Sequence, residues 1–391
     1  MNLVKDRIIP QSIKIMKQKL LLFLLGIVSI SSCQVMETIP SNKINFDFYD
    51  NAIPSSSILC NPKYVKLQQP CNDAIIKRID KVLFLEDRII IVDRQRNSII
   101  LFDKDGNYLC SSNSLIGRGK NEYVHFVDCA IDKGENLLYV SCDAPFQLMA
   151  LNKNLKVEKC IHTNEMFDEI STDNNYLYAL VEDLSDNDRF ELRRYEKANL
   201  NKPYNVLLKQ ESVISGVRGF GKVMCSDGNK TFVCMPFDNV IHIIENGKIT
   251  DSYDVNLKEK WFSYKDSKNL VGGRFYKKNK DVNWTIQNIC ASDSTLLFNT
   301  NLADVYRIDL RNNRGDSHTE LINDKSFYNT TWLIPYGGIH KSVIRVIPPI
   351  AIRDALENHF INEGRISGSL IKSITNSNYG DNPVLEIFQI K

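Results

Sequence analysis

The sequence lacks the short motifs that mark common catalytic sites. It contains no GxSxG nucleophile elbow, no HExxH zinc motif, no P-loop and no EF-hand loop. Its six histidines are scattered, and no group of Cys and His residues has the spacing of zinc ligands. We therefore predict no catalytic residue, no metal and no cofactor, and we favour a binding role over catalysis.

Clustered positive charge is also missing. The chain has 49 Lys and Arg residues against 47 Asp and Glu, a net charge of +2. Proteins that bind nucleic acids depend on basic patches for most of their affinity, so this even mixture excludes nucleic acid as a partner. After residue 33 there is no apolar run long enough to span a bilayer.

The ten cysteines do not form a disulfide framework. No CxxC occurs, and nine remain when Cys33 is set aside, an odd number that leaves at least one unpaired within a monomer. Most of the others stand among Val, Ile, Leu and Phe, so we expect them to be small buried hydrophobic residues. A pairing of Cys60 with Cys71 stays open.

A targeting segment occupies the N-terminal region. Basic residues precede the apolar run Leu20–Ile30, and a stretch of small residues then ends at Cys33. This arrangement resembles the lipobox of bacterial lipoproteins, which implies a signal peptide over residues 1–32 and acylation of Cys33. An ordinary secretory signal is the alternative. Gln34, in place of Asp, favours the outer membrane of the cell envelope.

Lipidation at Cys33 predicts how the rest of the chain is organised. Several acyl chains anchor a protein stably, because each buried methylene adds about 0.8 kcal/mol. The polar segment 33–57 is expected to be the lipidated tether, and residues 58–391 the folded domain. The membrane is then a partner through the N-terminal anchor alone.

Three stretches repeat one pattern of two apolar runs separated by a polar break: Ile89–Cys110, Leu137–Cys160 and Leu296–Asn312. Such a unit cannot bury its apolar faces alone and must stack on copies of itself. Repeated antiparallel sheets of this length close into a propeller. Similar units begin near Val82, Phe126, Glu169, Phe220, Ile286 and Ile334. The sequence thus predicts an all-β, six-bladed β-propeller of four-stranded antiparallel blades.

Other segments complete this prediction. Asp105-Gly106 and Asn246-Gly247 mark tight hairpin turns. Asn256–Asn283 is a long insertion of the kind that is often functional. Pro349–Ile361 predicts a short amphipathic helix near the C-terminus. The alternating strand Asn382–Ile390 is expected to complete a blade with an N-terminal strand, which closes the ring.

Three segments carry a family resemblance. Ile91–Leu109 resembles an NHL-type propeller repeat. The loop Ile116–Tyr123 and the ending Asn382–Leu385 resemble the "IGxxGxGPGEY" and "NPVL" motifs of the six-bladed β-propeller lipoproteins of Bacteroides and relatives. The loop departs from that pattern at Lys120-Asn121. The resemblance implies an envelope lipoprotein and no particular reaction.

In a propeller, the links from each outer strand to the next inner strand surround one mouth of the central channel. Aromatic and Arg side chains, which favour recognition, gather in these links. We predict a ligand-binding face with these contact residues: Arg118, Glu122, Tyr123, Arg218, Arg274, Tyr276, Trp332 and Tyr336. For each residue the alternative is packing between blades.

The partner of this face is expected to be a glycan, a peptide or another envelope protein. The alternative function is that of a propeller hydrolase or lyase acting on an extracellular glycan. A buried, convergent pair of carboxylates at the channel mouth would favour the enzyme. An open aromatic bowl without titratable clusters would favour binding.

Overall fold

The computed structural model describes residues 41–60, 62–183, 189–210, 221–227, 229–257, 261–262, 272–302, 305–319, 321–322, 324, 341–358 and 380–391. Pro40–Lys391 forms one compact unit. Every described strand and every hydrophobic cluster lies within this unit, so it carries its own core.

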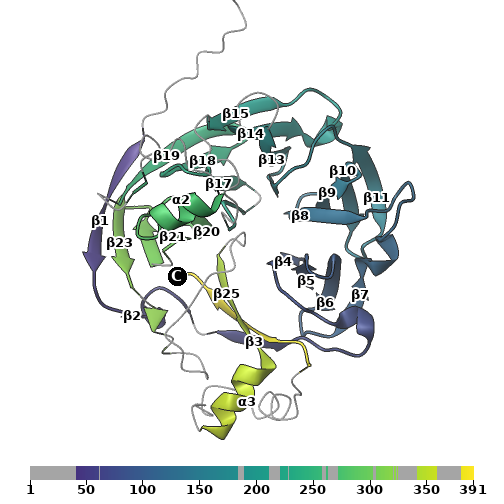
Figure 1. The fold of residues 1–391 in the computed structure, drawn as a ribbon, viewed down its shortest axis with the longest axis horizontal. Coiled ribbons are helices and arrows are strands. Elements are labelled where there is room, and N and C mark those ends of the chain that lie inside the picture. Colours follow the sequence, from purple (N-terminus) through teal and green to yellow (C-terminus); the bar gives the residue numbers. More distant parts are fainter. Residues whose placement is uncertain are drawn as a thin grey trace, which may run out of the picture. The chain divides into compact units, whose positions relative to one another are not determined.

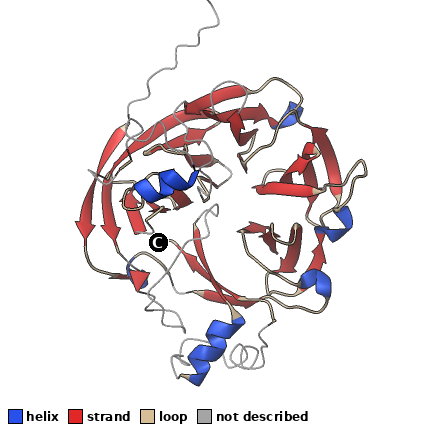
Figure 2. Ribbon diagram, viewed as in Figure 1, coloured by secondary structure: helices blue, strands red, loops and turns tan. Residues whose placement is uncertain are grey.

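The unit is built mainly from antiparallel sheets of consecutive strands (Figure 2). Three four-stranded sheets consist of β4 (Lys81–Leu85), β5 (Arg88–Asp93), β6 (Ser98–Asp103) and β7 (Tyr108–Ser111); β8 (His125–Asp132), β9 (Leu137–Ala144), β10 (Phe146–Asn152) and β11 (Val157–His162); and β12 (Glu169–Thr172), β13 (Tyr176–Asp183), β14 (Arg189–Glu196) and β15 (Asn205–Gln210). Two further groups of four are β16 (Met224–Ser226), β17 (Lys230–Cys234), β18 (Val240–Glu245) and β19 (Lys248–Asn256), and β20 (Ile286–Ala291), β21 (Thr295–Thr300), β22 (Val305–Asp309) and β23 (Arg314–His318). These five groups coincide with five of the units expected from the sequence.

The sheets follow one another around a central axis, as in a β-propeller (Figure 1). The first strands of neighbouring groups, β4, β8, β12, β16 and β20, contact each other in that order near the axis. The last strands, such as β7, β11 and β15, lie at the periphery. Hydrophobic clusters join neighbouring groups of strands; one of them unites Leu83 and Val92 with Phe126 and Val140. Burial of the apolar faces therefore depends on the neighbouring sheet.

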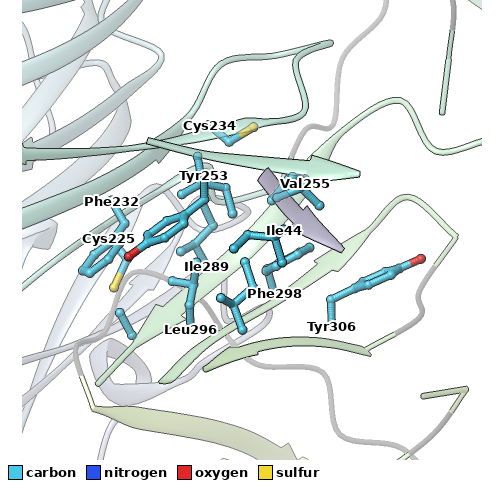
Figure 3. Packing of buried hydrophobic residues seen from close by; sticks show 14 of the residues in the cluster. Ile44, Cys225, Phe232, Cys234, Tyr253, Val255, Ile289, Leu296, Phe298 and Tyr306 are labelled. Carbon is cyan, nitrogen blue, oxygen red and sulfur yellow. The ribbon is translucent and has the colours of Figure 1, made fainter. Parts of the chain in front are cut away.

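An additional N-terminal strand joins two of these groups. β1 (Asn42–Tyr49) pairs in parallel with β19 through its first half and with β23 through its second half, forming a nine-stranded sheet. Ile44 and Phe46 are buried in the cluster that these strands share. Figure 3 labels Ile44 in this cluster together with Phe298 and Val255. The outer strands β19 and β23 would otherwise expose unpaired backbone N–H and C=O groups, and β1 pairs with both of them.

This strand changes the predicted boundary between tether and domain. We expected residues 33–57 to be a tether, but the described fold begins with β1, and β2 (Ile53–Pro54) pairs with β24 (Leu321–Ile322). The alternation of Ile44, Phe46 and Phe48 with polar residues is the strand signal. The residues of β19 that pair with β1 lie some 200 residues later in the sequence, so the local sequence did not reveal this pairing.

The ring is closed by both ends of the unit, as predicted. β26 (Val384–Gln389) pairs antiparallel with β25 (Ser342–Ile347) on one side and with β3 (Lys63–Lys66) on the other. Asn382 reinforces the closure, because its side chain donates to the backbone oxygens of Gln68 and Ala74. The sixth repeat unit expected from the sequence begins near Ile334, which lies outside the described residues.

The turns and helices follow their local signals. Gly106 and the pair Asn246-Gly247 have positive φ, as tight turns require. The inserted segment contains α2 (Gly272–Lys278), and the predicted C-terminal helix is α3 (Pro349–Glu357). Short 3-10 turns are η1 (Ser55–Ser57), η2 (Asn72–Ala74), η3 (Ser112–Leu115) and η4 (Lys197–Asn199). None of the helices in the described ranges is long and apolar enough to cross a bilayer.

Candidate functional site

The links between sheets share one end of the ring, which we call the link face. Neighbouring inner strands run in the same direction, because Glu169 at the start of β12 bonds to Met224 at the start of β16, and Ser226 at the end of β16 bonds to Thr172 at the end of β12. Within each antiparallel group of four, the outer strand ends where the inner strand began. The strand ends joined by the links therefore lie on one face.

The link between β7 and β8 is a closed loop organised by Glu122. The Gly119 N–H donates to Glu122 Oε2 at 2.7 Å, and the Gly117 N–H donates to the Tyr123 carbonyl at 2.9 Å. A Cβ on Gly117 would lie 1.9 Å from Glu122 Oε2. The two glycines of the motif thus make room for the carboxylate, and Glu122 acts on the shape of the loop.

The two other predicted residues of this loop differ in exposure. The Tyr123 side chain is fully buried, with its hydroxyl 2.6 Å from Ser112 Oγ and its ring edge-on to Phe126 at 5.6 Å. It supports the loop from within the core and is not placed to contact a ligand. Arg118 is exposed at the tip of the loop.

The helix α2 carries two further predicted residues, Arg274 and Tyr276, and both are exposed. The Tyr276 ring is edge-on to Trp284 at 5.9 Å and to Phe275 at 5.8 Å. Phe275 and Trp284 are buried in a cluster with Phe237. The exposed Tyr276 is therefore held on an aromatic base of two buried residues, Phe275 and Trp284.

The remaining predicted residues lie outside the described residues: Cys33, Arg218, Trp332 and Tyr336. The structure thus places Arg118, Glu122, Arg274 and Tyr276 in links whose strand ends belong to the same face. It does not describe a common cavity that joins them.

Sequence reasoning missed a charged cluster on the inner strands. Asp128 on β8 lies with its two oxygens 3.1 and 3.2 Å from Lys81 Nζ of β4, and Lys222 Nζ donates to Asp128 Oδ1 at 2.9 Å. The Ile170 N–H of β12 donates to Asp128 Oδ2 at 3.0 Å. One buried carboxylate therefore connects four consecutive sheets near the axis.

Glu169 continues this cluster to the next strand. Its two oxygens accept the backbone N–H groups of Val223 and Met224 at 3.1 and 3.0 Å. Burial raises the pKa of Glu169. For Asp128, burial acts in the same direction, but the ammonium groups of Lys222 and Lys81 outweigh it and hold the pKa of Asp128 at about 2.

The two carboxylates have the opposed pKa shifts of an acid/base pair, but their surroundings limit such a role. Both are almost completely buried, and both oxygens of each accept hydrogen bonds from neighbouring strands. A proton on Glu169 would displace one of its backbone donors. The main role of the cluster is therefore to hold the inner strands together. The sequence signal for it was Asp128, a charged residue inside the apolar run Phe126–Ile131.

No metal or redox site stands out in the described part of the chain. Its residues include no group of three His, Cys, Asp or Glu side chains that could hold a metal ion. All nine described cysteines, including Cys60 and Cys71, are free thiols. Burial raises the pKa of Cys225 to about 12, which keeps this thiol protonated and unreactive.

Comparison with known proteins points to one family and to one well-matched fold. The model of a family described as a domain of unknown function, DUF4934, matches residues 42–389. A protein from Bacteroides fragilis NCTC 9343 that is described as exported has a crystal structure similar to this chain, with 15% identity and a TM-score of 0.68. The alignment covers 90% of this chain and 100% of that one, and at this identity it shows the fold alone.

Two propellers are less similar. BamB from Moraxella catarrhalis has 10% identity and a TM-score of 0.39, covering 74% of this chain and 72% of that one. The Pan2 WD40 domain of Neurospora crassa has 10% identity and a TM-score of 0.41, covering 80% and 88%. At these scores neither likeness carries an inference. No curated protein matches the sequence.

Proposed function

The chain belongs to the DUF4934 family, and from this premise we propose that it is an exported envelope protein that binds a ligand through its link face. The ligand is a glycan, a peptide or another envelope protein. Arg118, Arg274 and Tyr276 are the proposed contact residues among those described, and Glu122 shapes the loop that presents Arg118. Tyr123 belongs to the core beneath it. Arg218, Trp332 and Tyr336 remain proposed contacts from the sequence.

The observation that carries this proposal is the exposed Tyr276 on its buried aromatic base. Tyr276 is 39% exposed although its ring packs against Phe275 and Trp284. An immobilised aromatic loses little entropy on binding, and aromatic and Arg side chains are the preferred anchors of recognition surfaces. Arg274 is exposed two residues earlier on the same helix.

Envelope location is proposed from the N-terminal sequence together with the fold match to an exported protein. We infer signal-peptide cleavage before Cys33 and lipid attachment at that residue in the outer membrane. The test is membrane partitioning: Cys33→Ala should release the protein into the soluble fraction. Retention of the variant in membranes would contradict the anchor.

We also propose that the propeller has six blades with NHL-like repeats. The support is the arrangement of β25, β26 and β3, which pack on one side against Ile89 and Phe102 of the β4–β7 sheet. On the other side, Val343 and Phe388 pack against Cys290 and Leu297 of β20 and β21. Packing of this sheet against both the first and the last of the five groups supports a sixth blade between them.

A glycan hydrolase or lyase is the second candidate, because Asp128 and Glu169 have opposed pKa shifts near the axis. The saturated hydrogen bonding of both carboxylates is the argument against it. Incubation of the protein with oligosaccharides that bind to it, followed by product analysis, decides this. Turnover that disappears in Glu169→Gln would establish the enzyme and replace the binding proposal.

The binding proposal is tested by screening a chain that begins at Gln34 on glycan and peptide arrays. Each hit is then titrated against Arg274→Ala and Tyr276→Ala, which are expected to weaken binding at least about tenfold. Tyr49→Ala is the matched control, since Tyr49 is 47% exposed on the peripheral strand β1. Equal affinity of wild type and both link-face variants would reject this face as the binding site.

A further inference from the structure

A cavity of about 390 Å³ lies at the end of the ring opposite the link face. It is lined by the final residues of inner strands, among them Ile131 and Thr172, and by the turn between β4 and β5. It also extends between the first sheet and the closing sheet, where Phe84, Ile89 and Ile387 supply an apolar wall. A volume of this size lies within the usual range for small-molecule sites.

The charged groups around this cavity are mostly cationic. Lys63, Lys104 and Lys133 line it from three different sheets, and Arg88 lies in the same lining. Lys63 Nζ and Lys133 Nζ each donate to a backbone carbonyl at 3.3 Å. Within the described part of the chain, none of these three lysines forms an ion pair with a carboxylate.

The lining contains only two acidic side chains for these cations in the described part of the chain. Glu86 pairs with Lys153 at 3.2 Å, and Asp87, which is 59% exposed, forms an ion pair with Arg88, with Oδ1 3.6 Å from Arg88 Nε. Lys81, which also lines the cavity, is neutralised by Asp128. The cavity therefore combines an apolar wall with an excess of cations, since Lys63, Lys104 and Lys133 form no ion pair within the described residues and Arg88 has one long ion pair.

Arg88 has a buried hydrogen-bond donor that no described group satisfies. Its side chain is 22% exposed, yet its Nε is buried and has no hydrogen-bond partner, because its ion pair with Asp87, at 3.6 Å, is too long for a hydrogen bond. A buried donor without a partner is costly, and a charged donor more so. Arg88 lines the cavity, so an anion there would add an acceptor for its guanidinium group.

We propose that this cavity binds a small amphiphilic anion, with one carboxylate or sulfonate at Arg88 and the neighbouring lysines and an apolar body against Phe84 and Ile89. The site is separate from the link face, since it lies at the other end of the inner strands. Arg88 sets the preference for negative charge, and the apolar wall determines the shape of the ligand body.

The test uses two fluorescent probes with the same aromatic body. The probe 8-anilinonaphthalene-1-sulfonate carries the anion, and N-phenyl-1-naphthylamine lacks it. The chain from Gln34 to Lys391, which contains every described strand, should bind one equivalent of the sulfonate more tightly than the neutral probe. Arg88→Gln should weaken sulfonate binding at least about tenfold and change binding of the neutral probe less than twofold.

Arg311→Gln is the matched control, because Arg311 is exposed on the turn between β22 and β23 and should leave both affinities unchanged. A melting temperature equal to wild type verifies that Arg88→Gln is folded. If it is not, the double variant Lys63→Gln/Lys104→Gln, at two exposed positions, takes its place with the same expected loss. Absence of a saturable sulfonate site, or undiminished sulfonate affinity in the folded cavity variant, overturns the proposal.

Discussion

Lys222 Nζ lies 2.9 Å from Asp128 Oδ1, although the two residues are 94 positions apart in the sequence. Lys81 approaches the same carboxylate from the other side. The contact holds the start of one inner strand against another that is two sheets away. It is possible because all inner strands converge on one axis.

Asp128→Asn is expected to destabilise the unit by about 3–5 kcal/mol, because it removes the carboxylate to which the ammonium groups of Lys81 and Lys222 both donate. The free energy of unfolding in urea measures the loss. Asp281→Asn is the control, since Asp281 is 83% exposed, and it should change stability by less than about 0.5 kcal/mol. Similar stability of both variants would show that the cluster does not hold the inner strands.

Phe46→Ala is expected to cost about 3–5 kcal/mol, since the ring is buried edge-on to Phe298 and Tyr306 between two sheets. Lys43 is exposed three residues earlier on the same strand, so Lys43→Ala should leave the free energy of unfolding unchanged. Denaturant titration of both variants makes the comparison. A small effect at Phe46 would mean that β1 is not an integral part of the fold.

Gly117→Ala is expected to destabilise the unit by about 1–2 kcal/mol, because its Cβ would displace the Glu122 carboxylate from the Gly119 N–H. In a Glu122→Ala background the same substitution should cost much less, and a double-mutant cycle measures the difference. Gly273→Ala is the control, because nothing lies within 4 Å of its added Cβ. Additive effects would contradict the role given to Glu122.

Acid sensitivity should depend on His242. Burial lowers the pKa of His242 from 6.5 to about 4, so the unfolded chain binds more protons between these values. Stability is therefore lost as the pH falls from about 6.5 towards 4, by roughly 1–2 kcal/mol at pH 5. His242→Gln retains a partner for Ser252 Oγ and should show a smaller loss between pH 7 and pH 5. His125→Gln, at an exposed histidine, should lose as much as wild type.

Local sequence predicted the strands well where the signal was repeated. The turns at Gly106 and Gly247 and the alternation of Val384–Gln389 each act within a few residues, so they specified sheets and ring closure directly. The segment containing β1 was interpreted as a tether because the strands that pair with it, β19 and β23, lie far away in the sequence. Similarly, Tyr123 was predicted as a contact residue but is buried, since aromatic character alone does not tell a core residue from a contact residue.

The sequence by itself determined the repeated antiparallel units, the hairpin turns and the closing strand, because hydrophobic period and glycine conformation are properties of short segments. Only the tertiary structure decided which charges meet at the axis and which cations face the cavity at the opposite end. Those relationships join Lys81, Asp128 and Lys222, or Lys63, Arg88 and Lys133, from different sheets. Distances between sheets depend on how the ring closes, and no pattern within one sheet encodes that.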